Sequence, residues 1–98
     1  MHSETACEAL RKGVCLELRY NSYARVVEVH AVGISTAGNP VMRAWQIRGG
    51  SVSNEPVGWK LMRLDEAMGA ALTNERSEAP RPGYKPGDKG MQQIICEL

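Results

Sequence analysis

The chain has 98 residues, of which 43% are hydrophobic and 23% charged, and its formal net charge is +1. This length suits one domain with a single modest core, so residues 1–98 are expected to form one domain. The composition is that of an ordinary globular protein and excludes wholesale disorder, while the near-neutral charge excludes a strongly basic nucleic-acid-binding protein. No apolar run reaches the roughly 18 residues of a membrane span, and no basic segment leads into an apolar one. We therefore expect a cytoplasmic protein.

The cysteines predict neither a metal site nor a disulfide framework. Cys7, Cys15 and Cys96 are odd in number and widely spaced, and no C-x-x-C pair occurs. Neither His2 nor His30 has a partner at metal-ligand spacing. We therefore expect three reduced thiols, buried or half-buried as small apolar side chains, and no metal or cofactor.

The N-terminal segment reads as a short helix. Ser3 is a suitable N-cap, Cys7 and Leu10 form a narrow apolar stripe, and Gly13 is a suitable residue to end the helix. About two and a half turns do not persist alone in water, so this helix is expected to pack on the rest of the domain.

Strands follow the helix. Residues 14–20 alternate between apolar and polar, with Cys15 on the polar side, and residues 25–32 are rich in valine. The two segments are expected to pair as an antiparallel hairpin, and residues 41–47 form a third strand.

Residues 58–67 are the stretch around which the other strands are expected to be organised. Trp59, Leu61 and Arg63 share one face of this strand. The other face carries Lys60, Met62 and Leu64, so each face has large apolar side chains and one cation. A strand with one wet face would show a cleaner alternation. The pattern therefore predicts a central strand covered on both sides, with Trp59 mostly buried.

The last third of the chain is less regular. Residues 68–74 are expected to be a weak fifth strand, or a helical turn leading into one. Residues 76–90 are a basic loop rich in proline and glycine. Residues 79–90 within it are expected to be mobile and to contact a partner or ligand through Arg81, Tyr84 and Lys85. Residues 91–96 are a final strand that closes the sheet or pairs with a partner. Short strands at this spacing predict a mainly β fold, either a small barrel or a strongly bent antiparallel sheet with a short N-terminal helix.

Four segments of the chain resemble the WYL domain family, over residues 6–75. The motifs are Leu16-Glu17-Leu18-Arg19-Tyr20, Arg25-Val26-Val27-Glu28-Val29, Val41-Met42-Arg43-Ala44-Trp45 and Met62-Arg63-Leu64-Asp65. The chain also looks like a group of short bacterial proteins in which a Gly-Trp-Lys-Leu strand is followed by a Pro-Arg-Pro-Gly-Tyr-Lys loop.

The sequence departs from the family pattern at several positions. Pro40, Val41 and Met42 occupy the positions of the Trp-Tyr-Leu triplet. Val29 stands where the family has a proline, and Lys60 where its fourth strand has an arginine.

The resemblance implies a five-stranded Sm-like or SH3-like barrel. Domains of this family usually follow a DNA-binding helix-turn-helix in bacterial transcription regulators, where they sense nucleic acid or small anionic ligands. A chain of this length has no room for a helix-turn-helix and would be a stand-alone module of transcription regulation.

Four cations are candidates for the ligand site, because arginine and lysine bind phosphate oxygens. They are expected to converge on one mouth of the barrel: Arg25, Arg43, Lys60 and Arg63. Trp45 and Tyr84 are the aromatic candidates for stacking on a nucleobase. The alternative is that the cations are separate surface charges, paired with Glu28, Asp65 and Glu66.

The residues favour a binding module over an enzyme. Cys15 and His30 lie on neighbouring predicted strands, but no third residue to orient them is evident. The expected partner is an anionic ligand, a nucleotide or single-stranded nucleic acid. The alternative is a protein-interaction module, in particular a homodimer, in which the loop and residues 91–96 pack against another chain.

Overall fold

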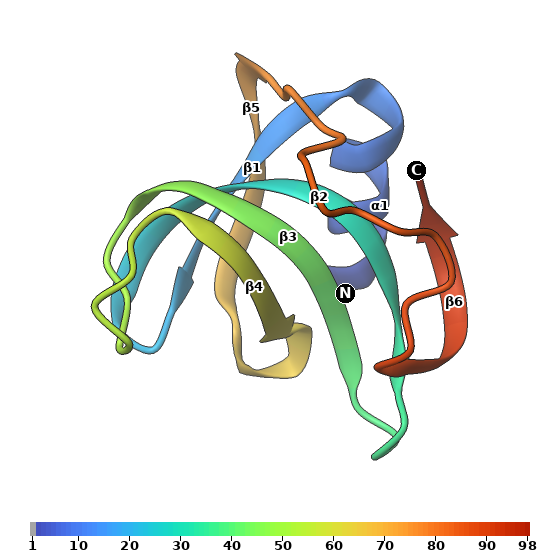
Figure 1. Cartoon of the computed structure of the whole chain (residues 1–98). Coiled ribbons are helices and arrows are strands. Elements are labelled where there is room, and N and C mark those ends of the chain that lie inside the picture. The colour runs from blue at the N-terminus through green and yellow to red at the C-terminus, as the bar shows by residue number, and fades with distance from the viewer. Residues whose placement is uncertain (1) are drawn as a thin grey trace.

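The computed structural model describes residues 2–98, which form one short helix and one antiparallel sheet (Figure 1). The elements are α1 (His2–Lys12), β1 (Val14–Tyr20), β2 (Tyr23–Ser35), β3 (Pro40–Gly49), β4 (Gly58–Arg63), the 3-10 turn η1 (Leu64–Glu66), β5 (Met68–Arg76) and β6 (Met91–Glu97). The mainly β fold and the short N-terminal helix are confirmed. Residues 68–74 are a strand, as expected.

The sheet is strongly bent and open. Its strands follow the order β4-β3-β2-β1-β5, and β6 pairs with β2. The edge strands β4 and β5 do not pair with each other, so the five-stranded barrel is not confirmed. The structure matches the alternative expectation, a strongly bent antiparallel sheet (Figure 1).

Strand β2 is the centre of the sheet. One of its edges pairs with β3, while the other pairs first with β1 and then, from Ala31 to Ser35, with β6. Its pairing with β3 shifts register between Val26 and Val27 and again between Val29 and Ala31. Irregularities of this kind bend a strand and increase its twist, which lets one long strand serve both ends of the sheet.

The apolar core lies between α1 and the inner face of the sheet. Ala6, Cys7 and Ala9 of the helix are buried there against side chains from β1 to β4. These sheet residues include Leu16, Leu18, Val27, Met42 and Met62. Small helix residues let α1 approach the sheet closely, and Leu10 packs on the margin of the core.

The prediction of three reduced thiols was wrong. Cys7 and Cys96 form a disulfide that joins α1 to β6 across a sequence separation of 89 residues, and Cys15 is buried as a free thiol. The pairing of β6 with β2 places β6 next to α1, and such a long-range contact leaves no mark in local spacing. Cys15 was expected on the wet side of β1 but has no exposed surface, because its side of the sheet is also covered.

The prediction that residues 58–67 form a central strand was also wrong. β4 is an edge strand and Leu61 is 43% exposed, whereas Trp59 is half-buried and more of its surface is buried than exposed. The apolar bulk on both faces has another cause. Met62 packs in the core, while on the opposite face the segment that follows β5 contacts Trp59.

No helix among residues 2–98 is long and apolar enough to cross a membrane.

Replacing Leu10 tests the packing of α1. We expect Leu10→Ala to lower the free energy of unfolding by about 1–3 kcal/mol, because a partly buried leucine loses its core contacts. Urea unfolding followed by circular dichroism measures the change. Glu8→Ala, on an exposed position of the same helix, is the control and should change little; equal effects of the two substitutions would contradict the docking of α1.

Candidate functional site

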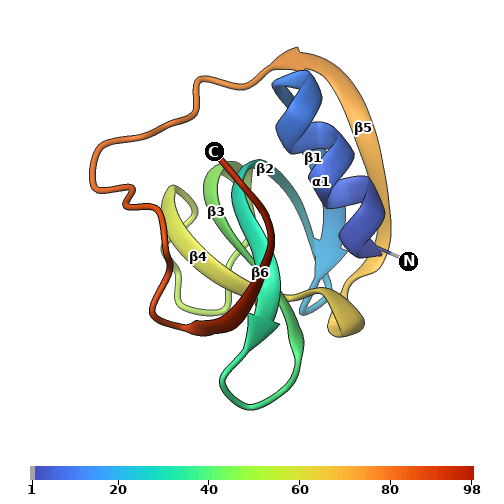
Figure 2. The same ribbon diagram turned by 90° about the vertical axis from the view of Figure 1, so that its right-hand side faces the viewer.

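The outer face of the sheet, opposite to α1, carries an unusual row of side chains. Glu28 of β2 pairs with Trp45 of β3, which pairs with Trp59 of β4, so the three side chains lie side by side. Residues 77–90 run back across this face to β6, and Figure 2 shows them and α1 on opposite sides of β2 and β3. We call these residues the covering loop.

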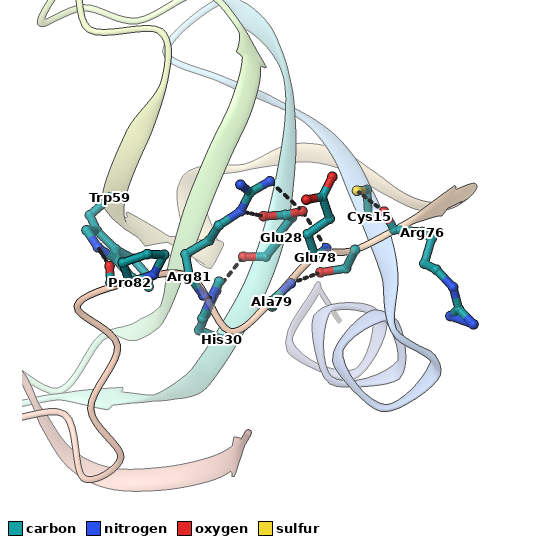
Figure 3. A network of polar contacts seen from close by, with 10 residues as sticks. Cys15, Glu28, His30, Trp59, Arg76, Glu78, Ala79, Arg81 and Pro82 are labelled. Carbon is teal, nitrogen blue, oxygen red and sulfur yellow. Dashed lines mark hydrogen bonds and ion pairs between the residues drawn. The ribbon is translucent and has the colours of Figure 1, made fainter.

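The covering loop is held by a buried carboxylate. Glu28 is 1% exposed. Arg81 donates to its two oxygens from Nε (2.6 Å) and Nη2 (3.2 Å), and the main-chain N–H of Glu78 donates to Oε2 at 2.7 Å (Figure 3). The Arg81 guanidinium also lies over the Trp45 ring, 5.6 Å from its centroid. A carboxylate with these partners can be buried as an ion.

His30 is a second attachment point. Its Nδ1–H donates to the carbonyl oxygen of Glu28 (2.9 Å), and its Nε2 accepts the main-chain N–H of Arg81 (3.0 Å), which assigns the neutral tautomer. Its ring lies against Trp59 and Tyr84, at centroid distances of 4.6 and 5.3 Å. Burial lowers the pKa of His30 below its ordinary value of 6.5. The imidazole therefore stays uncharged near neutral pH.

Beside this network, the loop and β4 enclose a cleft of about 540 Å³. Its lining comprises Arg43, Trp59, Gly83, Tyr84, Lys85, Pro86, Gly87, Asp88 and Lys89. The Trp59 indole donates to the carbonyl oxygen of Pro82 at 3.2 Å. Gly83 has φ +94°, and a β-carbon there would lie 3.3 Å from Trp59 Nε1, so glycine suits this close approach.

The cleft contains three cations and one carboxylate. Arg43 donates to both oxygens of Asp88, at 2.6 and 3.2 Å, and these bonds lower the pKa of Asp88. Lys85 and Lys89 are exposed, and within residues 2–98 neither side chain makes a hydrogen bond or ion pair. Their ammonium groups are thus available to an anion.

Two of the six predicted site residues line this cleft, Arg43 and Tyr84. Trp45 lies beside it, under Arg81 and edge-on to Trp59 at 5.4 Å. The other three, Arg25, Lys60 and Arg63, lie elsewhere.

The prediction that Arg25 converges with Arg43, Lys60 and Arg63 on one anion-binding site was wrong. Arg25 is only 4% exposed, and its guanidinium lies over the rings of Tyr20 and Tyr23. It donates to the Gln46 side chain and to the Tyr20 carbonyl oxygen. In the register of β1 and β2, Arg25 is opposite Leu18, which places it on the core side of the sheet.

Lys60 and Arg63 are each engaged locally. Lys60 donates to the Ser51 and Ser53 hydroxyls and to the Glu55 carbonyl oxygen, and so holds the loop before β4. Arg63 pairs with Asp65 and Glu66, as the alternative interpretation expected. Glu28, by contrast, pairs with Arg81. The four cations therefore do not form one patch, because Arg25 and Lys60 face the core side and Arg43 and Arg63 the outer side.

Arg81 and Lys85 were expected only as contact groups of the loop. Sequence reasoning missed the other residues that build the cleft and its support, namely Glu28, His30, Asp88 and Lys89. One signal was present. Glu28 and His30 alternate with valines in a strand that otherwise reads as buried, so both faces of β2 are covered. The identity of the covering segment was not evident from this pattern.

Cys15 and His30 have separate partners. The Cys15 thiol lies 3.8 Å from the Arg76 carbonyl oxygen, and both His30 nitrogens are bonded to the main chain. Burial, with smaller contributions from Glu75 and Glu28, raises the pKa of Cys15 to about 11, so the thiol is protonated at neutral pH. Residues 2–98 contain no group of three His, Cys, Asp or Glu side chains arranged to hold a metal ion.

Comparison with known proteins returned no match: no protein-family model, no curated protein and no solved structure is similar to this chain. The resemblance to the WYL family stays a prediction.

The Glu28 network can be tested by removing one charge. Glu28→Gln keeps the shape of the side chain but weakens its bonds to Arg81, so we expect a loss of about 1–3 kcal/mol in the free energy of unfolding. Glu75→Gln is the matched control, since Glu75 also pairs with an arginine, Arg48, but on the exposed surface. Urea unfolding should show a clear loss for the first variant and almost none for the second. Similar values for both would contradict the role of Glu28.

The pKa of His30 predicts a pH dependence. The unfolded chain takes up a proton at His30 near pH 6.5, whereas the folded chain resists protonation. The stability contributed by neutral His30 is therefore complete above pH 6.5 and declines as the pH falls toward its lower folded pKa. Urea unfolding between pH 7.5 and 5 should show this decline in the wild type and a smaller one in His30→Gln. Parallel curves would show that His30 is not responsible.

Proposed function

We propose that the chain forms a non-enzymatic WYL-like module that binds a nucleotide or a short single-stranded nucleic acid in the cleft beside the covering loop. The observation that carries this proposal is the composition of the cleft. Aromatic rings and unpaired ammonium groups meet there within one space of about 540 Å³. Ligand sites in proteins commonly have volumes of about 300–1,000 Å³.

The two kinds of side chain suit the two parts of a nucleotide. A base stacks on the Trp59 or Tyr84 ring, an interaction open to every base because each has a π-face. The phosphate is bound by Lys85 and Lys89 at the rim. Arg43 is held in place by Asp88, and its remaining N–H donors stay available to a phosphate oxygen.

The support of the loop favours binding. Glu28, His30 and Trp59 each bond to the covering loop just before Gly83. A loop attached in this way loses little freedom when a ligand arrives, which lowers the cost of binding. The earlier expectation of a mobile loop is replaced by that of a loop ordered from Glu78 to Pro82.

The second candidate is a protein-interaction or homodimerisation module. It is favoured by a groove of about 620 Å³ between α1 and β6, next to the exposed Ile95. The two candidates differ in their response to salt. Phosphate binding weakens steeply as salt rises, whereas association through apolar side chains does not.

The test is binding of fluorescein-labelled eight-nucleotide DNA and RNA and of adenosine monophosphate, at 50 and 200 mM salt. For Lys85→Ala/Lys89→Ala we expect affinity for the oligomers to fall by about tenfold or more, with a shallower salt slope. Lys12→Ala, on the surface of α1, is the matched control and should bind as the wild type does.

If the wild type binds none of these probes at low salt, the binding function is wrong. Analytical ultracentrifugation of the same protein then tests the homodimer form of the alternative, for which we expect a dimer.

A further inference from the structure

The Cys7–Cys96 disulfide lies two residues from contacts that shape the cleft. Leu98 accepts the Tyr84 hydroxyl at its carbonyl oxygen (3.2 Å), and its N–H donates to the His30 carbonyl oxygen (3.0 Å). Glu97 accepts the Gly87 N–H (3.0 Å). The end of β6 therefore supports the loop that carries Tyr84 and Lys85.

The end of β6 has few other attachments. Within the described residues β6 pairs with β2 alone, and this pairing shifts register twice. Met91, at its start, is the only buried residue of the strand. The bond from Cys96 to the helix is thus the strongest restraint on the part of β6 that reaches the cleft.

The disulfide borders an open surface. Cys7 lines the groove of about 620 Å³ between α1 and β6, together with Arg11, Ile34 and Ile95. Cys7 is 2% exposed, whereas Cys96 is half-buried. Arg11 lies one helical turn beyond Cys7, where its charge favours a departing thiolate.

We propose that the Cys7–Cys96 disulfide is a site of thiol–disulfide exchange with a dithiol reductant, and that its reduction loosens the end of β6 and the cleft-forming part of the covering loop. The effect on ligand binding rests on the proposed function; the effect on the loop does not. A reducing cytoplasm, the location expected from the sequence, would supply such dithiols.

The exchange proceeds in two steps. A thiolate of the dithiol attacks Cys96 Sγ, the bond to Cys7 breaks, and Cys7 leaves as a thiolate that takes up a proton. The second thiol of the reductant then loses its proton and attacks the reductant sulfur that is bonded to Cys96. Cys96 is released as a thiolate, which takes up a proton. Two electrons pass to the protein, and the reductant becomes a cyclic disulfide.

Reduction is expected to act locally. The core around Leu16, Val27 and Met42 also contains Ala6 and Ala9, so α1 stays packed on the sheet through these residues when the disulfide is reduced. Cys15 does not compete for either sulfur, because it lies on the outer side of β1 against the Arg76 carbonyl oxygen.

The experiment compares oxidised wild type, wild type reduced with dithiothreitol, and Cys7→Ser/Cys96→Ser, with Cys15→Ser as the control that keeps the disulfide. Amide hydrogen exchange is measured by NMR. On reduction, and in the double variant, we expect the Gly87 and Leu98 amides to exchange about tenfold faster or more, while Val27 and Ala44 in the core keep their protection. Cys15→Ser should match the oxidised wild type.

Two results overturn the proposal. One is unchanged exchange of Gly87 and Leu98 on reduction; the other is loss of protection throughout the core, which would make the disulfide a staple of the whole fold. Adenosine monophosphate and the labelled oligomers are titrated into both redox states of the wild type. If neither state binds them, the proposed function fails, while the amide data still decide whether the disulfide controls the loop.

Discussion

The buried carboxylate of Glu28 is the interaction on which the outer half of this structure depends. It accepts hydrogen bonds from the Arg81 side chain and the Glu78 main chain, and it has almost no exposed surface. A buried carboxylate without such partners is strongly unfavourable. The covering loop and β2 therefore stabilise each other: the loop shields the charge, and the charge attaches a segment that has no regular secondary structure of its own.

The two faces of the sheet are covered by different physical means. On the inner face, small residues of α1 pack against apolar side chains, and the contact is stabilised by removal of apolar surface from water. On the outer face, hydrogen bonds to Glu28 and His30 are directional, so they specify where each loop residue lies. The cleft with its aromatic and cationic lining lies on the outer face, beside the loop that these bonds hold.

Much of the fold was readable from local pattern. The short helix, the hairpin of β1 and β2, and the strands β3 to β6 all follow from alternation, turn residues and propensity. The candidate site was only half predicted. Arg43 and Tyr84 line the cleft, but Arg25 is buried on the other face. Register shifts in β2 decide which face a cation lies on, and Lys60 and Arg63 bond to residues close to them in the chain. The spacing of residues in the sequence reveals neither the register shifts nor these bonds.

By itself, then, the sequence determined the kind and order of the elements, because these depend on backbone preferences and on periodicity over a few residues. Only the tertiary structure decided that β4 is an edge strand, that Cys7 meets Cys96, and that the covering loop lies on Glu28 and His30. Each of these contacts joins segments far apart in the chain: the Arg81 and Glu28 side chains are separated by 53 residues and the two cysteines by 89. Such contacts form because burying the whole chain at once leaves few arrangements in which every buried polar group has a partner.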